Sequence, residues 1–335
     1  MEKIIQESLE RYDFKNPKLE FIRHNENITY KVLDELNTYV LRVHKPIEGF
    51  SLGIHQRDQE IFKYIESEMQ LIDYAKRCMN TPIQKPVKNK MGEFVSVLQD
   101  GTCVTVLEWV QGDTINNIPM TETIGKTIGT MIAELHKCFN ELENNEDNRP
   151  VKNVLNHDIK RYMYDQNMLD VIEVELSKII RNGLMEKDKV DIMKDAVRVI
   201  KGIMDELDEM QNMSGIVHAD LSPSNLIFSN EKIVPIDFSL SGYGFYYMDI
   251  GLIVSQYKDN NIKRSIVSGY EETMQKEIPL RYIEAFIALG VILFIVCQYD
   301  KVRTQDWFDG AVKRWCETIF NPLINGKSFV YESNQ

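Results

Sequence analysis

The sequence predicts an α+β fold with two lobes, a small β-rich N-terminal lobe and a larger, mainly helical C-terminal lobe. Residues 1–107 contain short β-prone runs and one long helical pattern. Residues 113–335 instead repeat apolar side chains mostly at helical spacing. A compact group of β-prone runs interrupts these helices at residues 215–237.

The composition is that of a soluble globular protein. The chain has 335 residues, of which 43 % are hydrophobic and 27 % charged, enough for one large or two ordinary domains. Its net charge of −12 argues against nucleic-acid binding and suits a cationic small substrate. The five cysteines lack metal-ligand or redox spacing, which predicts free or buried thiols in a reducing compartment. They are Cys78, Cys103, Cys138, Cys297 and Cys316.

The chain shows no signal for export or membrane insertion. The first residues carry no signal-peptide pattern. The uncharged run Ala285–Cys297 is thirteen residues long, too short to span a bilayer, and we expect it to be a core helix. We therefore expect a cytoplasmic protein, a monomer or homodimer, without membrane partners.

In chain order, the N-terminal part begins with a short amphipathic helix within residues 1–20. Alternating apolar residues predict strands over Leu19–Val32 and Tyr39–Val43. Apolar residues at helical spacing predict a helix over Ile54–Met69. The β-branched run Cys103–Gly112 is predicted to be a strand that ends in a turn.

The C-terminal part is predicted to contain a series of helices. The first covers Thr121–Phe139, and residues 155–212 contain two more, broken near Asn182. Further helices follow the β-prone region, over Ile250–Tyr257, Lys263–Met274, Leu280–Tyr299 and Asp306–Phe320.

The stretch from His218 to Asn225, with sequence HADLSPSN, lies between the apolar runs 215–217 and 226–228. A third run, 233–236, ends in Asp237. Strand, polar loop, strand, turn and strand should therefore present Asp220 and Asn225 on one loop, with Asp237 close by. The alternative is an Asx-rich hairpin loop without chemistry.

His-x-Asp-x-x-x-x-Asn followed by Ile-Asp-Phe resembles the motifs of the aminoglycoside phosphotransferase and choline kinase families. Protein kinases carry His-Arg-Asp and Asp-Phe-Gly at these places, where this chain has His218-Ala219-Asp220 and Asp237-Phe238-Ser239. The later segment 247–251 is similar to the aspartate-containing segment of the small-molecule kinases. The resemblance implies a two-lobed protein-kinase-like fold.

The same resemblance implies roles for the motif residues. Phosphoryl transfer depends on positioning and charge neutralisation. Asp220 is expected to be the catalytic base, and Asn225 and Asp237 are expected to be Mg²⁺ ligands beside the phosphates of ATP or GTP. His218 and Asp249 are expected to support the loop over residues 218–225, called the catalytic loop below. Asp249 is expected to do so by accepting backbone hydrogen bonds.

In the N-terminal lobe, Arg42 stands where the family strand carries its phosphate-binding lysine. Arginine can hold phosphate bidentately; the alternative is an edge-strand arginine in solvent. Glu60 resembles the helix glutamate that pairs with this cation, with Glu66 and Glu68 as the solvated-face alternatives. The preceding loop, residues 23–29, has no glycine, unlike the phosphate loop of protein kinases.

Residues 108–112 resemble the hinge of the family, between lobes 1–107 and 113–335. The main chain at Glu108 and Val110 is expected to bind the purine; the alternative is an interior strand packed by its tryptophan. The last predicted helix carries Trp307, Phe308 and Trp315, which resemble acceptor-site aromatics; the favoured alternative is ordinary helix packing.

The resemblance implies an ATP- or GTP-dependent phosphotransferase acting on a small-molecule hydroxyl, as in an aminoglycoside, choline or homoserine. Because glycines are absent from the phosphate loop and Arg42 replaces lysine, a kinase-like binding or structural protein with little turnover is the alternative. A protein kinase is a third hypothesis, disfavoured by Ser239 after Asp237-Phe238.

Overall fold

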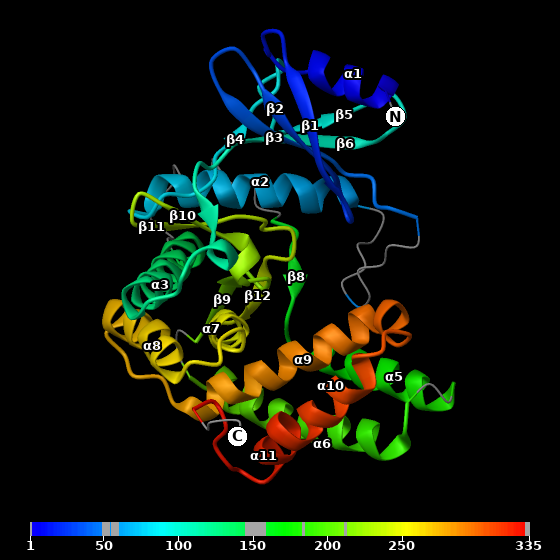
Figure 1. Ribbon diagram of the computed structural model, residues 1–335, viewed down its shortest axis with the longest axis vertical. Coiled ribbons are helices and arrows are strands. Elements are labelled where there is room, and N and C mark those ends of the chain that lie inside the picture. Colours follow the sequence, from blue (N-terminus) through cyan, green and yellow to red (C-terminus); the bar gives the residue numbers. More distant parts are fainter. Residues whose placement is uncertain are drawn as a thin grey trace.

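The computed structural model of the protein describes residues 2–48, 54, 60–144, 159–182, 185–210 and 213–331. Figure 1 shows a β-rich N-terminal lobe above a larger helical lobe. The N-terminal lobe contains α1 (Glu2–Glu10), β1 (Lys18–His24), β2 (Ile28–Leu33), β3 (Thr38–Val43), α2 (Ile61–Cys78), β4 (Pro86–Val87), β5 (Val95–Val97) and β6 (Cys103–Glu108).

The N-terminal strands form an antiparallel sheet of order β1-β2-β3-β6-β4, with β5 also paired to β6. Alternate side chains such as Val32, Leu41 and Val106 are buried in its core. Arg42 pairs with Thr29 on one side and Thr105 on the other, so β3 is an interior strand. The edge-strand alternative for Arg42 is therefore wrong.

Helix α2 begins at Ile61, later than the predicted start at Ile54, and residues 55–59 lie outside the described part of the chain. It continues to Cys78, beyond the predicted end at Met69. Its buried face includes Ile65 and Ile72. The helix extends beyond its predicted end because its apolar stripe continues past Met69.

The C-terminal lobe is built from helices. They are α3 (Glu122–Asn144), α5 (Gln166–Arg181), α6 (Lys187–Asp208), α7 (Tyr247–Val254), α8 (Asn260–Met274), α9 (Leu280–Val302), α10 (Phe308–Trp315) and α11 (Asn321–Ile324). Short turns of helix cover Ile115–Asn117, Pro223–Asn225 and Cys316–Phe320. Helices α3 and α8 lie so close that a Cβ at Gly129 would overlap the Ile266 carbonyl oxygen.

Two small sheets carry the motif residues. The first has the order β11-β10-β7, built from β7 (Asp113–Thr114), β10 (Leu226–Ser229) and β11 (Lys232–Pro235). The second has the order β8-β12-β9, built from β8 (Tyr162–Met163), β9 (Ser214–Val217) and β12 (Gly242–Phe245). The catalytic loop joins β9 to β10, so it connects the two sheets.

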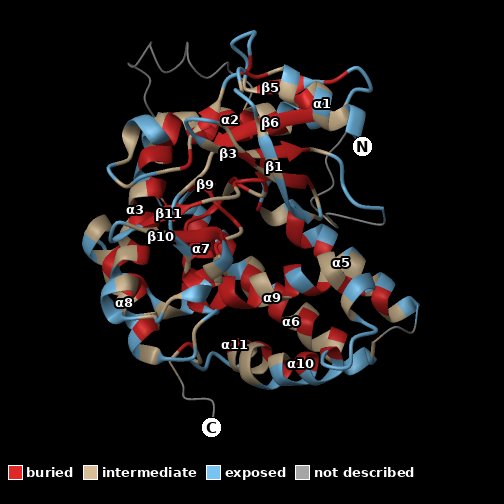
Figure 2. Cartoon of the chain, turned by 45° about the horizontal axis from the view of Figure 1, so that its top comes forward, coloured by how far each residue is buried: buried red, intermediate tan, exposed pale blue. Residues whose placement is uncertain are grey.

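Helix α9 is the buried centre of the helical lobe. Among the described helices it is the one whose length and composition would allow it to cross a membrane, yet 61 % of its most apolar window is buried. It packs against α7, α6 and α5, and Figure 2 shows buried residues along it and α7. We interpret α9 as a core helix.

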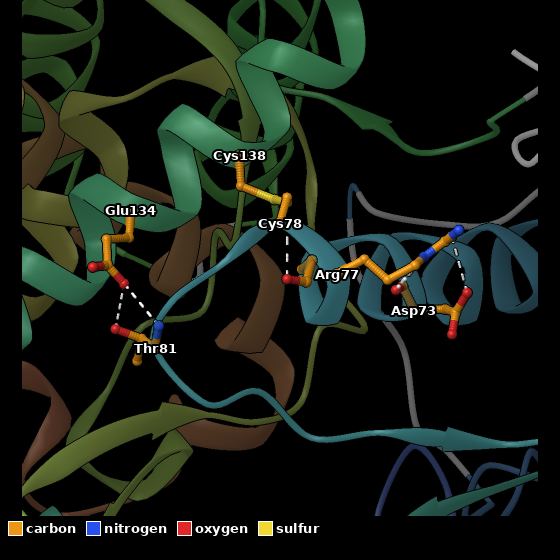
Figure 3. The surroundings of a disulfide bond; sticks show 7 residues. Asp73, Arg77, Cys78, Thr81, Glu134 and Cys138 are labelled. Carbon is orange, nitrogen blue, oxygen red and sulfur yellow. Dashed lines mark hydrogen bonds and ion pairs between the residues drawn. A yellow bond between two sulfur atoms is a disulfide. The ribbon is translucent and has the colours of Figure 1, made fainter. Parts of the chain in front are cut away.

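The prediction that the cysteines are all unpaired was wrong. The structure joins Cys78, at the end of α2, to Cys138 on α3 by a disulfide, with Cα atoms 5.8 Å apart (Figure 3). Cys103, Cys297 and Cys316 take part in no disulfide. A sequence separation of 60 residues gives no pairing signal, because only the crossing of α2 and α3 brings these residues together.

Candidate active site

The catalytic loop holds Asp220 and Asn225 against each other. The Asn225 Nδ2 donates to the Asp220 carboxylate and to its main-chain carbonyl, each at 2.9 Å. The loop closes with a turn of helix over Pro223–Asn225. Because Nδ2 faces Asp220, Oδ1 is the atom of the Asn225 amide that could bind a metal.

Asp249, in the first turn of α7, anchors the start of this loop. Its carboxylate accepts the backbone N–H groups of His218 and Ala219, each at 2.8 Å, and lies 2.9 Å from His136 Nε2. Ala219 has a left-handed backbone, φ 62°, which costs an L-residue about 1–2 kcal/mol. The hydrogen bond to Asp249 stabilises that conformation.

These contacts determine the charge states of the anchor. Burial opposes ionisation of Asp249, but the hydrogen bond and charge of His136 outweigh it and hold the Asp249 pKa below its usual range. Burial lowers the pKa of His218, which favours the neutral form of its ring. The His218 Nε2 lies 3.1 Å from the Ile236 carbonyl oxygen, so the ring links the loop to the strand that precedes Asp237.

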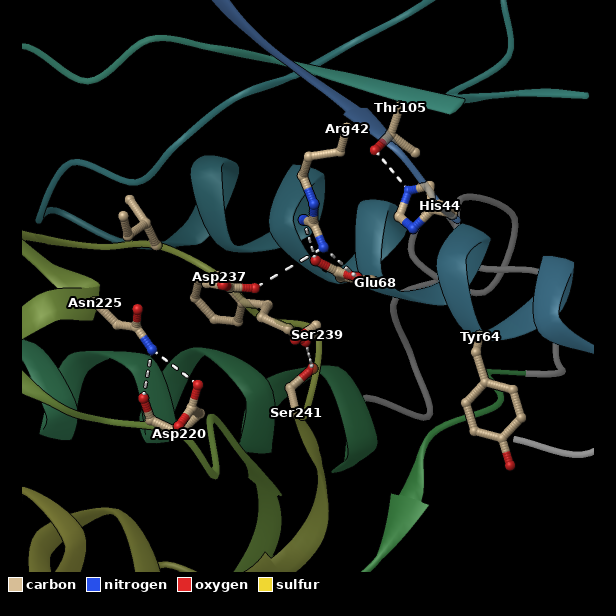
Figure 4. A network of polar contacts seen from close by, with 12 residues as sticks. Arg42, His44, Tyr64, Glu68, Thr105, Asp220, Asn225, Asp237, Ser239 and Ser241 are labelled. Atoms are coloured by element: carbon tan, nitrogen blue, oxygen red, sulfur yellow. Dashed lines mark hydrogen bonds and ion pairs between the residues drawn. The ribbon is translucent and has the colours of Figure 1, made fainter. Parts of the chain in front are cut away.

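Asp237 meets two arginines from the N-terminal lobe. The Arg23 Nη2 donates to its carboxylate at 2.7 Å, and the Arg42 Nη2 lies 3.9 Å from its other oxygen. Burial opposes ionisation of Asp237, but these guanidinium groups outweigh it and lower the pKa. Figure 4 shows Arg42 projecting from β3 toward Asp237, with Asp220 and Asn225 on the opposite side.

Pairing of β10 with β11 brings the two motifs together. The Ile236 N–H donates to the Asn225 carbonyl at 2.9 Å, which places Asp237 one residue beyond this bond. Asp237 itself has φ 66°, a conformation that aspartate adopts more readily than most residues. Backbone outliers of this kind cluster at functional sites.

The predicted pair of Arg42 with Glu60 was wrong. Arg42 Nη1 binds Glu68 at 2.7 Å, and the Glu68 side chain is 1 % exposed. Glu60 precedes α2, is 43 % exposed and pairs with Lys63 and Lys160. Glu68 lies on the buried face of α2, three residues after Ile65 and four before Ile72. An acid within the apolar stripe was the signal that could have identified it.

Arg161 is a positioning residue that sequence analysis missed. Its guanidinium donates to the carbonyls of Phe238, Ser239 and Ser241 at 2.7–2.8 Å, and also to that of Tyr64 on α2. It is buried and holds the segment after Asp237 against α2. No local sequence pattern marks a residue whose partners lie so far away in the chain.

At the predicted hinge, the main chain of Glu108 is engaged within the protein. Its N–H donates to the Lys85 carbonyl at 2.8 Å, and its carbonyl accepts from Gln84 Nε2 at 3.1 Å. Glu108 and Val110 both line a cavity of about 410 Å³. Gly112 follows with φ 138°, and a Cβ there would overlap the Phe228 carbonyl. A glycine is therefore required where the chain enters the larger lobe.

Asp220 has an unusual protonation equilibrium. Burial and the charge of Asp237 raise its pKa to about 7, while the hydrogen bond from Asn225 opposes the rise. Two neighbouring carboxylates disfavour each other's ionisation, so added positive charge at Asp237 would favour ionised Asp220.

The donor set fits a divalent cation bound together with phosphates. Within the described residues, no cluster of three or more His, Cys, Asp or Glu side chains could hold a metal ion by itself. Asn225 and Asp237 offer hard oxygen ligands, and Mg²⁺ usually takes one or two such groups and completes its shell with phosphate and water. The two guanidinium groups on Asp237 show that this carboxylate is placed to face positive charge.

Comparison with known proteins agrees with this geometry. The sequence profile of the phosphotransferase enzyme family matches residues 18–276, more than half of the chain. The chain belongs to the phosphotransferase enzyme family. The resemblance found in its motifs is thereby confirmed, and the protein is a phosphotransferase.

Two relatives of this chain carry the names of kinases that act on small molecules. Amicoumacin kinase of Bacillus subtilis (strain 168) is 21 % identical over 257 residues, covering 76 % of this chain and 67 % of the relative. The 4-hydroxytryptamine kinase of Psilocybe cyanescens is 21 % identical over 239 residues, covering 67 % of this chain and 62 % of the relative.

Solved structures confirm the predicted kinase-like α+β fold. A microcompartment-associated aminopropanol kinase gives a TM-score of 0.74 at 20 % identity, covering 98 % of this phosphotransferase and 100 % of that chain. The amicoumacin kinase hAmiN, in complex with AMP-PNP, Ca²⁺ and Ami, gives 0.70 at 18 % identity, covering 98 % and 94 %.

Proposed function

We propose that this phosphotransferase moves the γ-phosphate of ATP or GTP to a hydroxyl of a small molecule, with Asp220 as base and Asn225 and Asp237 as Mg²⁺ ligands. The observation that carries the proposal is the convergence of these three side chains, through the Asn225–Asp220 hydrogen bonds and the β10–β11 pairing. The small-molecule names of the two relatives support a small acceptor.

Each residue has a defined task in this proposal. Asp220 accepts the hydrogen bond of the attacking hydroxyl and receives its proton, which leaves late in a loose transition state. Asn225 orients Asp220 through Nδ2. The metal supplies charge neutralisation at the transferring phosphoryl group. Arg42, held by Glu68, presents its guanidinium to the same region. The cavity lined by Glu108 and Val110 receives the purine, with the main chain of Val110 as its partner because the main-chain groups of Glu108 are already engaged.

The test measures nucleoside diphosphate release from ATP and from GTP with Mg²⁺, using slow hydrolysis by water as the basal reaction. Asp220→Asn keeps the shape of the side chain and removes its charge. We expect turnover to fall by about 10² or more, the scale of general acid–base catalysis, with nucleotide binding nearly unchanged. Asp300→Asn, at an exposed acid, serves as the control.

A second variant tests the metal ligand. Asp237→Ala is expected to abolish the thermal stabilisation by Mg²⁺-nucleotide while the protein stays folded. Equal hydrolysis rates for wild type and Asp220→Asn, with Asp237→Ala inactive, would show that Asp220 is not the base. If Mg²⁺-nucleotide stabilises Asp237→Ala against heat as much as it stabilises wild type, Asp237 is not a metal ligand.

A further inference from the structure

A cavity opens directly beside Asp220. It has a volume of about 510 Å³ and is lined by the catalytic loop, α7, α9, α10 and the turn after α10. A volume of this size suits a drug-sized molecule. The acceptor hydroxyl must reach Asp220, so this cavity is where the rest of the acceptor lies, an inference that rests on the proposed function.

Part of the cavity wall is aromatic. Phe294 on α9 lies between Trp307 and Trp315, with ring centroids 6.4 and 6.0 Å away. Phe294 and Trp307 are 38 % and 49 % exposed, although aromatic side chains of this size gain most when buried. Leu252 and Ile287 continue the apolar wall. An apolar ring in the cavity would cover these exposed faces.

The polar groups of the cavity are almost all neutral. Gln256, Gln298 and Ser255 can donate or accept hydrogen bonds. Asp220 is the charged residue of the lining. Its carboxylate is already used by the acceptor hydroxyl whose proton it receives. A compound with several ammonium groups would bury charges without carboxylates to pair with, which is strongly unfavourable.

We propose that the acceptor is a mostly apolar alcohol or phenol that contains a ring and carries at most one positive charge. Its ring lies against Phe294, Trp307 and Trp315, and its hydroxyl lies at Asp220. The hydroxyl oxygen forms the new bond to the γ-phosphorus as the bond to the β-phosphate oxygen breaks. Asp220 takes the hydroxyl proton, and the products are a phosphate monoester and a nucleoside diphosphate.

Binding is measured by calorimetry on the full chain with Mg²⁺ and AMP-PNP, which separates it from transfer. The probes are 2-phenylethanol and 4-hydroxyindole, with kanamycin as the polycationic compound. We expect the aromatic probes to bind at least about tenfold more tightly than kanamycin. Trp307→Ala and Phe294→Ala should each weaken that binding about tenfold, which corresponds to about 1.4 kcal/mol.

Two further variants control for folding and for general surface effects. Trp307→Phe keeps a ring and should retain most of the binding. Phe62→Ala removes a ring of matching exposure, 39 %, from α2 outside the cavity, and should bind like wild type. Tighter binding of kanamycin, no binding of either aromatic probe, or wild-type binding by both alanine variants of the cavity overturns the proposal.

Nucleoside diphosphate release in parallel reactions separates this proposal from the proposed function. In one outcome, the aromatic probes bind in a way that depends on Trp307 and Phe294 while no probe raises nucleoside diphosphate release above the water reaction. That result supports the cavity assignment and counts against phosphoryl transfer. Release stimulated by kanamycin, and not by the aromatic probes, supports phosphoryl transfer and overturns the acceptor class.

Discussion

Asp237 and Asp249 are two aspartates in one active site, both with a lowered pKa, and they are held in different ways. Asp249 is fully buried, and the partners described above come from the C-terminal lobe: the His136 ring and the backbone of His218 and Ala219. Asp237 is 20 % exposed, and its partners Arg23 and Arg42 come from the N-terminal lobe.

Asp249 is therefore a fixed anchor, whereas Asp237 can change its partner. Backbone N–H groups and a buried ring have little freedom to move, so Asp249 keeps the catalytic loop in one conformation. Arginine side chains are long and can turn away, and Arg23 is itself exposed. Asp237 can therefore exchange a guanidinium for another cation without unfolding its surroundings.

The largest effect is expected from the anchor. Asp249→Asn replaces a buried acceptor of three hydrogen bonds by a neutral amide, and removing one partner of a buried charged pair typically costs about 3–5 kcal/mol. Urea denaturation should show a loss of unfolding free energy of this size. Asp300→Asn, at an exposed acid, should change it by less than about 0.5 kcal/mol. An equally small loss for Asp249→Asn would show that the anchor is dispensable.

The contribution of Asp249 should also depend on pH in a defined direction. Its pKa is lower in the folded state, so its stabilising charge is fully present above the unfolded-state pKa of about 3.9. It is lost as pH falls through the folded-state value. The stability difference between wild type and Asp249→Asn should stay constant from about pH 7 to 5 and shrink below about pH 4. A difference that grows on acidification would contradict the lowered pKa.

The next effect concerns the support of Arg42. Glu68→Gln removes the carboxylate that Arg42 contacts at 2.7 Å and leaves Asp237 at 3.9 Å together with the more weakly acting Glu26, so Arg42 should be drawn toward Asp237. We expect Mg²⁺-nucleotide binding, followed by calorimetry, to weaken about tenfold, or about 1.4 kcal/mol. Glu60→Gln is the matched control and should bind nearly as wild type, because exposed pairs contribute little. A larger loss of Mg²⁺-nucleotide affinity in Glu60→Gln than in Glu68→Gln would indicate Glu60 as the partner of Arg42.

The smallest effect is expected at Arg23. In the proposed metal site this guanidinium competes with the metal for Asp237, so Arg23→Ala should strengthen binding of Mn²⁺ in the absence of nucleotide. An exposed pair contributes about 0.2–1 kcal/mol, which corresponds to at most about a fivefold change in metal affinity. Arg11→Ala, which breaks an exposed pair with Glu7 at 3.1 Å, should leave metal binding unchanged. Weaker Mn²⁺ binding in Arg23→Ala would make Arg23 a supporting residue of the metal site.

The sequence by itself determined the parts of the site that depend on neighbouring residues. A strand, a polar loop and a hairpin place Asp220, Asn225 and Asp237 together, because β10 and β11 pair across a short turn. The resemblance of the strand over residues 39–43 to the lysine-carrying strand of the family likewise identified Arg42 without knowledge of its partner. These features rest on local geometry and on hydrogen bonds between close segments, which composition and spacing express directly.

Tertiary structure alone decided which distant groups meet. Packing of the buried face of α2 brings Glu68 to Arg42, whereas Glu60 lies before the helix. The contacts of Arg23 and Arg161, the Cys78–Cys138 disulfide and the cavity beside Asp220 likewise join segments far apart in the chain. Such contacts depend on how whole elements pack, and no short stretch of sequence specifies that packing.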